Sequence, residues 1–394
     1  MTLANAAVLV VAGSALGISA LLAQGQPPAP GDPLPGLTAT EFAQFRLGQD
    51  DFTEVENTEE GLGPAFNATS CAACHNVPAI GGTSVVVETR AAYQDESGAF
   101  VGFGEAGDTL IHLFSTPPHR CQPVIPPDAT VVAHRAPLPV FGAGLIEAIP
   151  DDAILALEDP FDKNGDEISG RAAIVVDVAT GERRVGRFGW KAQHATLLAF
   201  SGDAYRNEMG ITNDLFPQEY AYGIAEADMR RCDPRPDPED VRDPVTRRRG
   251  IDNFESFMKF LAPIARGPVD ATAREGERVF AAIGCAACHV PALPTGPNAT
   301  PALNRQTVPL FSDLLLHDVG TGDGIPQGAA QPDEIRTAAL WGLRLRRPLL
   351  HDGTAGSIEA AIGRHRREAE LARRGFERLS ADDRARLLSF LRSL

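Results

Sequence analysis

The pentapeptide Cys-Ala-Ala-Cys-His occurs twice in this chain, at residues 71–75 and 285–289. Two cysteines separated by two residues and followed at once by histidine form a motif for covalent haem attachment, in which the thiols add to the vinyl groups and the imidazole binds the iron. A zinc ribbon or a redox dithiol also uses CxxC pairs, but zinc needs four soft ligands close together, and each pair here has only its own histidine nearby. We therefore predict two covalently bound haem c groups, held by Cys71, Cys74 and His75 and by Cys285, Cys288 and His289.

The two motifs look like copies of one structural unit, because Phe66 precedes Cys71 by five residues and Phe280 precedes Cys285 by the same number. A chain of 394 residues has room for two such domains and a leader. With 43% hydrophobic and 22% charged residues, the composition is that of a globular protein and excludes a disordered or multi-span membrane protein.

The net charge of −16 argues against a nucleic-acid partner, because phosphate binding depends on clustered lysine and arginine. Residues 331–394 nevertheless carry a net positive charge, so the charge is polarised along the chain. Such an asymmetry can orient a charged partner. We expect a small redox protein as the electron donor and no DNA or RNA partner.

The N-terminal segment has the features of an export leader. No lysine or arginine occurs in the first 45 residues, and an almost unbroken apolar stretch runs from Ala6 to Ala23 before the Pro-rich sequence QGQPPAPGDPLPG. The stretch is as long as a membrane-spanning helix and lacks the usual positive charges of a signal peptide, so a cleaved signal and an uncleaved anchor both remain open. We expect residues 1–36 to be leader and tether and the body of the protein to be periplasmic, with membrane contact only through an anchor.

Cys121 and Cys232 belong to neither haem motif. Two unassigned thiols in an oxidising compartment most often form a structural disulfide. We therefore expect a disulfide between Cys121 and Cys232 within the first domain, without a redox role.

Strand-like runs with turn signals occupy residues 83–190, and two of them, TSVVVETRAAYQDESGAFVGFG and AAIVVDVATGERRVGRFGW, predict hairpins. Helices are expected at residues 39–48, at residues 251–262 and from Ser380 onwards, where Asp383 completes a start signal. Before the helix at residues 251–262 lies the polar, Pro-rich section CDPRPDPEDVRDPVTRRRG, which marks a domain boundary.

This boundary divides the chain into two expected domains. The first haem domain covers residues 37–250 and includes the β insertion. The second haem domain covers residues 251–394.

The segment DKNGDEISG places the oxygen-bearing side chains of Asp162, Asn164 and Asp166 at positions one, three and five, as calcium-binding loops do. It lacks the glycine at position six and the closing glutamate at position twelve of such a loop. A calcium site and an ordinary Asx-rich turn are both open for this segment.

Further motifs give the chain a family resemblance. After the second CAACH come LLLHDVG (314–320), EIRTAALWGL (334–343) and LLHDGTAGSIEAAIGRH (349–365), and the first half contains GPAFNATSCAACH, FGAGLIEAIP, DKNGDEISGR, GRFGWKA and NEMGIT. In this order the motifs resemble the di-haem oxidoreductase family, relatives of bacterial di-haem cytochrome c peroxidases, over about residues 42–394. The resemblance implies a mostly α fold of two cytochrome c-like haem domains, the first with a β-hairpin-rich insertion, and haems in mutual electronic contact.

The resemblance also implies a second iron ligand for the second haem. In di-haem peroxidases the segment similar to LLHDGTAGSIEAAIGRH carries a methionine ligand fourteen residues after its first histidine. Here the first histidine is His351 and the corresponding residue is His365, so His289 and His365 are the expected axial pair and His351 is structural. The alternative for His365 is an exposed helical histidine. Because imidazole does not raise the haem potential as a thioether does, this haem is expected to have a lower potential than its peroxidase counterpart. His317, in LLLHDVG, is expected to hydrogen-bond near the second haem.

The stretch FGWKAQHATLLAFSGDAYRNEMG is similar to a peroxidase segment that begins with a tryptophan between the haems and ends in an EMG triplet whose glutamate lies over the peroxide site. This similarity implies an inter-haem position for Trp190 and the role of catalytic acid for Glu208, because a carboxyl group can move a proton between the oxygens of bound peroxide. A core role for Trp190 and a turn-capping role for Glu208 are the alternatives. Met209 or His194 could instead be a second ligand of the first iron.

Three functions are compatible with these features. The first is an exported di-haem c-type oxidoreductase that reduces hydrogen peroxide at the first haem with electrons delivered through the second. The second is an electron carrier with two six-coordinate haems, and the third is a di-haem enzyme that oxidises a protein partner. An open coordination position at the first haem separates the first function from the second.

Overall fold

The computed structural model describes residues 27–97, 99–102, 109–116, 123–218, 221, 224, 231–232 and 240–394. Helices carry more of these residues than strands do, and long irregular segments connect them. The described helices are α2 (Ala39–Thr53), α3 (Cys71–Cys74), α4 (Ala143–Glu147), α5 (Asp151–Leu155), α6 (Leu197–Met209), α8 (Gly250–Phe260), α9 (Ala271–Ala282), α10 (Ile358–Gly363), α11 (Glu370–Arg378) and α12 (Ala381–Leu391), with 3-10 turns η1 (Cys285–Ala287), η2 (Pro301–Leu303), η3 (Leu343–Leu345) and η4 (Arg367–Ala369). The described strands are β1 (Ala65–Phe66), β2 (Glu88–Gln94), β3 (Phe100–Gly102), β4 (Leu110–Ile111), β5 (Phe114–Ser115), β6 (Val131–Arg135), β7 (Ala173–Val176), β8 (Arg183–Gly186), β9 (Leu293–Pro294), β10 (Thr307–Val308), β11 (Leu316–His317) and β12 (Ile335–Arg336).

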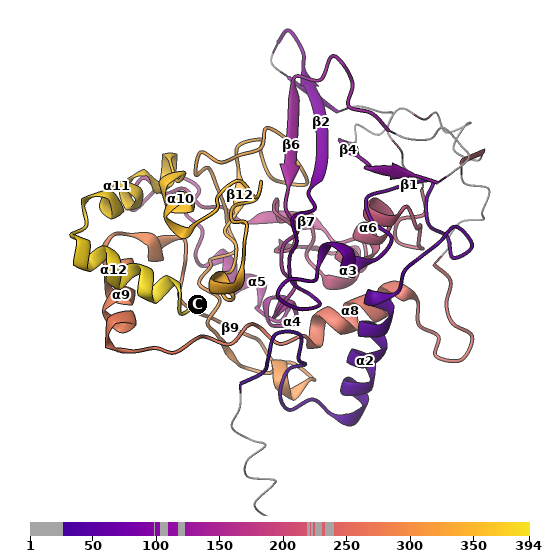
Figure 1. Ribbon diagram of the computed structural model, residues 1–394, viewed down its shortest axis with the longest axis horizontal. Helices are drawn as coiled ribbons and strands as arrows, with labels where there is room; N and C mark the ends of the chain where they lie inside the picture. Colours follow the sequence, from indigo (N-terminus) through magenta and orange to yellow (C-terminus); the bar gives the residue numbers. More distant parts are fainter. Residues whose placement is uncertain are drawn as a thin grey trace, which may run out of the picture.

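Each CAACH motif is associated with a pair of packed helices (Figure 1). Helix α2 precedes the first motif and packs against α8, and helix α9 precedes the second motif and packs against α12. A methyl group added to Gly48 of α2 would lie 2.1 Å from the backbone oxygen of Asn253, and one added to Gly276 of α9 would lie 2.0 Å from that of Arg386. Glycine therefore lets the two helix backbones approach closely at both crossings.

A phenylalanine one turn after each of these glycines packs in the same way. The ring of Phe52 lies 4.7 Å from a phenylalanine of α8 and 6.1 Å from the histidine of the first motif, measured between centroids. The ring of Phe280 lies 5.2 Å from a phenylalanine of α12 and 6.2 Å from the histidine of the second motif. Phe52 is therefore the structural counterpart of Phe280. The correspondence of Phe66 with Phe280 that the spacing predicts is wrong, because Phe66 lies in β1 and packs on Phe114 of β5.

Strand β2 is the centre of a four-stranded sheet and pairs with β3, β4 and β6, in each case antiparallel. The register between β2 and β6 places Glu88 opposite Arg135. The β2–β3 hairpin and the separate β7–β8 hairpin confirm the two hairpins that the sequence predicts.

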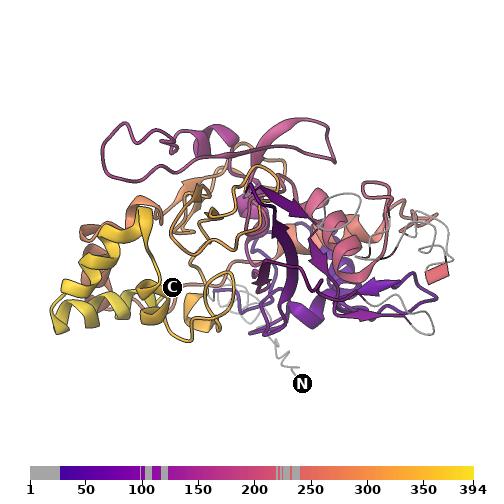
Figure 2. The same cartoon turned by 90° about the horizontal axis from the view of Figure 1, so that it is seen from above.

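Two groups of helices lie on opposite sides of the molecule in Figure 1, with α9 to α12 on one side and α2, α6 and α8 on the other. Helix α8 begins at Gly250, the predicted domain boundary, but packs against α2, α4 and α6. The helix that opens the predicted second domain therefore packs with the first helix group. The segment from α5 to β8 runs across both groups (Figure 2) and leads into Trp190.

The C-terminal helix begins where the sequence predicts. The Oγ atom of Ser380 accepts a hydrogen bond from the backbone N–H of Asp383 at 3.1 Å and caps α12. Among the helices of the described ranges, none is both long and apolar enough to cross a membrane. The apolar stretch of the predicted leader lies outside the described residues, which begin at Pro27.

Candidate active site

The first CAACH motif forms the one-turn helix α3. Nδ1 of His75 donates a hydrogen bond to the carbonyl oxygen of Gly82 at 2.9 Å, and burial lowers the pKa of this imidazole. A neutral histidine held through Nδ1 presents an unprotonated Nε2, which is the form that binds a metal. Burial raises the pKa of the Cys71 and Cys74 thiols to about 12, so neither is a reactive thiolate near neutral pH.

A cavity of about 170 Å³, the first cavity, lies beside this motif and contains Glu208 in its wall. Oε2 of Glu208 accepts a hydrogen bond from Nδ2 of Asn67 at 2.7 Å. Burial, and then the neighbouring carboxylate of Glu88, raises the pKa of Glu208 to about 8. Glu208 is therefore protonated at neutral pH, which is the state that a general acid needs.

The second motif contributes His289 to a separate cavity of about 400 Å³, the second cavity, which His365 also lines. Nδ1 of His289 donates to the carbonyl oxygen of Phe311 at 3.0 Å, and Nδ1 of His365 donates to that of Ala361 at 2.9 Å. Burial lowers the pKa of both imidazoles, to about 4 for His289. Two neutral imidazoles that are held in the same way thus line one space.

Trp190 lines both cavities, which is the position expected of a residue between the two motifs. Its Nε1 donates a hydrogen bond to the carbonyl oxygen of Ala136 at 2.8 Å. The guanidinium carbon of Arg346 lies 5.3 Å from the centroid of the indole, and the ring of His351 meets it edge-on at 6.1 Å. Contacts from three residues therefore fix the orientation of this indole.

The family model described as "Di-haem oxidoreductase, putative peroxidase" matches residues 125–394, more than half of the chain. This chain belongs to the di-haem oxidoreductase family. One curated relative of this chain is the methylamine utilization protein MauG of Methylorubrum extorquens, which is 28% identical over 178 residues. The matched region covers 39% of this chain and 45% of the relative, so the chain spans less than half the length of MauG.

Two solved structures are weakly similar to this chain. Hydrazine synthase of Kuenenia stuttgartiensis has a TM-score of 0.43 at 14% identity, with 99% of this chain and 100% of its own chain covered. The diheme peroxidase BthA of Burkholderia thailandensis also has a TM-score of 0.43 at 14% identity, with 93% and 87% covered. At scores this low, neither likeness assigns a residue or a function to the present chain.

The family implies haem, and the wall of the second cavity fits such a group. Nε and Nη2 of Arg346 and Nδ1 of His351 are buried, and no described residue forms a hydrogen bond with them. Burial lowers the pKa of Arg346 to about 10, because a buried cation without a partner is unfavourable. The propionate carboxylates of haem would pair with these atoms, while His289 and His365 would hold its iron.

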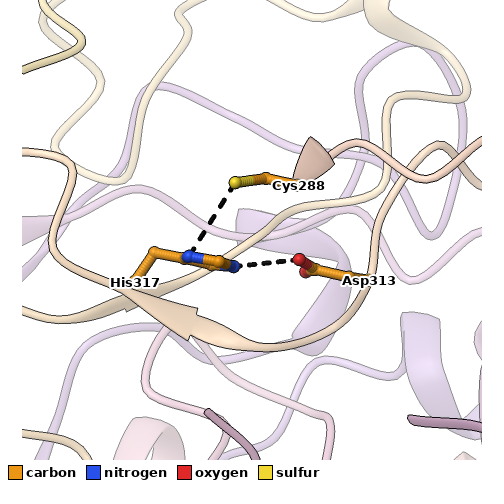
Figure 3. A group of neighbouring side chains, drawn as sticks. All are labelled: Cys288, Asp313 and His317. Atoms are coloured by element: carbon orange, nitrogen blue, oxygen red, sulfur yellow. Dashed lines mark hydrogen bonds and ion pairs between the residues drawn. The ribbon is translucent and has the colours of Figure 1, made fainter. Parts of the chain in front are cut away.

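His317 forms the hydrogen bonds that the sequence predicts for it, and Figure 3 shows its ring between Asp313 and Cys288. Its Nε2 lies 2.9 Å from Oδ2 of Asp313, and its Nδ1 lies 2.8 Å from Oε2 of Glu368 and 3.8 Å from Sγ of Cys288. Burial alone would lower the pKa of His317, but the hydrogen bonds to these three residues raise it well above the ordinary value. A thiol, a carboxylate and an imidazole at these distances could hold a metal ion, but Cys288 belongs to the second haem-attachment motif. We interpret this cluster as a set of charged residues that holds Cys288, and with it the second motif, in position.

The predicted calcium loop lies at the edge of the second cavity, where Asp166 is part of the wall. Its side chains bind its own backbone. Oδ1 of Asn164 accepts from the N–H of Asp166 at 2.9 Å, and Oδ1 of Asp162 accepts from the N–H of Glu167 at 3.2 Å. These hydrogen bonds are those of an Asx-rich turn, and calcium at Asp162, Asn164 and Asp166 stays a prediction.

The cysteines outside the motifs are described only in part. Cys232 is buried, whereas Cys121 lies outside the described residues. The disulfide between them therefore stays a prediction.

The two alternative ligands of the first iron differ in their surroundings. Met209 is buried and lines the first cavity. Nε2 of His194 lies 2.8 Å from Oδ2 of Asp203, and His194 is not part of the wall of either cavity. Of these two residues, Met209 is therefore the one that could ligate the first iron, and the alternative is an open position at that iron.

Several charged residues of the cavity walls are absent from the sequence predictions. Glu88, Arg90 and Arg135 line the first cavity, and Arg346 lines the second. Glu88 and Arg90 are two residues apart on β2, so their side chains lie on one face of the strand. This spacing is the signal by which the sequence could have indicated that the two charges are neighbours. The contact with Arg135 depends on the register between β2 and β6, which no motif in the sequence reveals.

Proposed function

We propose that this chain is an exported di-haem c-type cytochrome that reduces hydrogen peroxide at the first motif with electrons delivered through the second. The difference between the two cavities carries the proposal. The second is lined by His289 and His365, which can fill both axial positions of an iron. The first is lined by one imidazole, His75, and by the proton-bearing carboxyl group of Glu208. An iron held by His75 alone would keep a position for peroxide close to an acid.

Bound haem would supply one-electron transfer at both motifs and a site for peroxide at the first. The chain supplies a proton and holds its donor in place. Glu208 carries the proton, and its hydrogen bond with Asn67 fixes the carboxyl group in the cavity. Reduction of one hydrogen peroxide to two water molecules consumes two electrons and two protons, and Glu208 can donate one of those protons to the departing oxygen. Trp190 lines both cavities.

A titration tests this function without an external donor. Fully reduced holo-protein with two haems holds two electrons that peroxide can remove. Anaerobic addition of one equivalent of hydrogen peroxide is expected to reoxidise both haems while their absorbance is otherwise preserved. Reoxidation that requires a large excess of peroxide, accompanied by bleaching of the haem, would contradict the proposal.

One observation favours the electron carrier as a second candidate. Met209 lies in the wall of the first cavity and could occupy the sixth position of that iron. Cyanide binding to the reduced and the oxidised holo-protein separates the two candidates. Spectral changes that correspond to one haem per chain support an enzyme, whereas no binding in either redox state supports the carrier.

The proposal includes covalent attachment of both haems at the cysteines of the two CAACH motifs. It is supported by the motif spacing and by the position of each pair beside a cavity that its own histidine lines. The mass of the denatured protein is the test. We expect a gain of two haems in wild type and of one haem after Cys285→Ala with Cys288→Ala.

The apolar leader supports export to the periplasm, where the Cys121 and Cys232 thiols would form a disulfide. We also propose a small redox protein as electron donor and calcium at the loop of residues 162–170. Non-reducing mass analysis after thiol alkylation and metal analysis of the purified protein test the disulfide and the calcium.

A further inference from the structure

Two carboxyl groups share the wall of the first cavity. Glu88 is the first residue of β2 and Glu208 lies near the end of α6, and each carboxyl group shifts the pKa of the other. Two neighbouring carboxylates in one cavity wall repel, so such a pair is more stable when it holds one proton. The pair therefore holds one proton at neutral pH, and the surroundings decide which residue carries it.

The surroundings of Glu88 favour the carboxylate. Its Oε1 forms an ion pair with Nε of Arg90 and lies 3.6 Å from Nη1 of Arg135. Both arginine side chains are almost fully buried, at 7% and 3% exposure, so water screens these charges little. Burial raises the pKa of Glu88, but Arg90 and Arg135 outweigh it and keep the pKa below the ordinary value.

The surroundings of Glu208 favour the protonated form. Its Oε2 accepts a hydrogen bond from the neutral amide of Asn67, and the nearest carboxylate is that of Glu88. The titratable and charged groups that line the cavity around Glu208 are Cys71, Cys74, His75, Glu88, Arg90, Arg135, Asp203 and Tyr205. Among these, Glu88 is the group whose negative charge raises the pKa of Glu208 most.

The position of Glu88 is fixed from a distant part of the chain. Arg135, opposite Glu88 in the β2–β6 ladder, donates from Nε to Oδ2 of Asp323 at 2.7 Å. Asp323 also forms an ion pair with Nζ of Lys191 at 3.0 Å, and both side chains are buried. A continuous set of buried charges thus links the first cavity to a loop between β11 and β12.

We propose that Glu88 is a positioning residue that keeps one proton on Glu208 for delivery in the first cavity, while Arg90 and Arg135 hold Glu88 as the carboxylate. This inference rests on the proposed peroxide reduction and assigns the source of the proton. Glu88 acts through Glu208. The Glu88→Gln side chain keeps the size and the hydrogen-bonding capacity of Glu88 but loses the charge.

Infrared titration of the protonated-carboxyl stretch in the holo-protein tests the inference without turnover. In wild type we expect a band that disappears with a midpoint near the raised pKa of Glu208, about 8, and that is absent after Glu208→Gln. Glu88→Gln is expected to move this midpoint down by about one pH unit or more, because the repulsion is lost. Glu88→Asp keeps the charge and is expected to retain most of the raised midpoint.

A second buried carboxyl group provides the control for band assignment. Burial raises the pKa of Glu56 to about 7, and Tyr205 donates a hydrogen bond to it at 2.9 Å. Glu56→Gln is expected to remove a band with a midpoint near 7 and to leave the Glu208 band in place.

Peroxide turnover measured over the same pH range distinguishes the role of Glu88 from the proposed reduction of peroxide. The alkaline loss of turnover is expected to follow the infrared midpoint in wild type, Glu88→Gln and Glu88→Asp. An infrared midpoint of Glu208 that is unchanged by Glu88→Gln, in a variant with a native circular dichroism spectrum, would overturn the role of Glu88. If wild type shows no peroxide turnover but the infrared midpoint moves as stated, the proposed function fails and the proton-sharing pair is upheld.

Discussion

His289 and His365 line the same cavity, and each donates its Nδ1 proton to a backbone carbonyl oxygen, at 3.0 and 2.9 Å. This arrangement leaves Nε2 of both residues free of that proton and able to bind an iron. Two imidazole ligands give a lower haem potential than one imidazole and one thioether.

Replacement of His365 by methionine is expected to raise the reduction potential of the second haem. The change introduces a thioether ligand, and we expect a shift on the order of 0.1 V within the range of about 0.8 V over which axial ligands act. Spectroelectrochemical titration measures both haems separately. His194→Met is the matched control, because His194 lies in neither cavity wall, and it is expected to leave both potentials in place. Equal potentials in wild type and His365→Met would contradict the axial assignment.

Replacement of Trp190 by phenylalanine is expected to slow electron transfer between the haems and to destabilise the fold. The carbonyl oxygen of Ala136 loses its hydrogen bond with Nε1, and an unsatisfied buried acceptor costs about 1–3 kcal/mol. Rapid-mixing absorbance and denaturant unfolding measure the two effects. Trp341, the only other tryptophan in the sequence, lines neither cavity, so Trp341→Phe is expected to leave the transfer rate unchanged. Equal transfer rates in both variants would remove Trp190 from the path.

The sequence predicts two related haem units, but only the structure shows what they have in common. Gly48 and Phe52 of α2 correspond to Gly276 and Phe280 of α9 in their contacts. Helix α9 ends just before the second motif, whereas α2 ends at Thr53, well before the first. The extra chain in the first unit breaks the common spacing, so an alignment on the cysteines selects Phe66 instead of Phe52.

Alanine at either glycine is expected to destabilise the protein strongly. The added methyl group would meet a backbone oxygen at 2.1 Å at Gly48 and at 2.0 Å at Gly276, so a helix must move. Overpacking of this kind costs about 1–3 kcal/mol or more. The free energy of unfolding in denaturant is the measurement. Gly356→Ala is the control, because a methyl group there meets nothing within 4 Å, and a similar loss in all three variants would contradict the close helix contacts.

The sequence predicts the site residues that lie in motifs, but it does not predict the site residues whose positions depend on tertiary contacts. The histidines and cysteines of the motifs, His365 and Glu208 all line the two cavities. Arg346 and Arg135 reach their cavities through tertiary contacts: Arg346 contacts Trp190 far along the chain, and Arg135 faces Glu88 through strand register. Periodicity and spacing describe neighbours along the chain and give no register between separate elements.

Stability is expected to fall as the pH rises from about 7 to about 8, and Glu208 is expected to contribute to this fall. The pKa of Glu208 is raised to about 8 in the folded protein by burial and by Glu88, above that of the unfolded chain. The folded state therefore binds the proton more tightly, and this stabilisation is complete below the unfolded pKa and is lost as the pH passes about 8. The dependence contributed by one such group is at most about 1.4 kcal/mol per pH unit.

Denaturant unfolding at a series of pH values checks this dependence. Glu208→Gln is expected to reduce the decline between about pH 7 and about pH 8. Glu56→Gln is expected to reduce the decline mainly below about 7, because the pKa of Glu56 is raised only to about 7. Identical pH dependence in wild type and Glu208→Gln would show that Glu208 does not hold a proton in the folded protein.

Peroxide-dependent oxidation of a reduced one-electron donor by the holo-protein tests the central claim most directly, with wild type, Glu208→Gln and Glu56→Gln compared at neutral pH. The account predicts rapid turnover in wild type and a loss of about 10²–10⁴-fold in Glu208→Gln, the usual contribution of a positioned acid. Glu56→Gln, which removes a buried carboxyl group outside the wall of the first cavity, is expected to keep its turnover. Turnover at the level of free haem in wild type, unchanged by Glu208→Gln, would contradict peroxide reduction at this site.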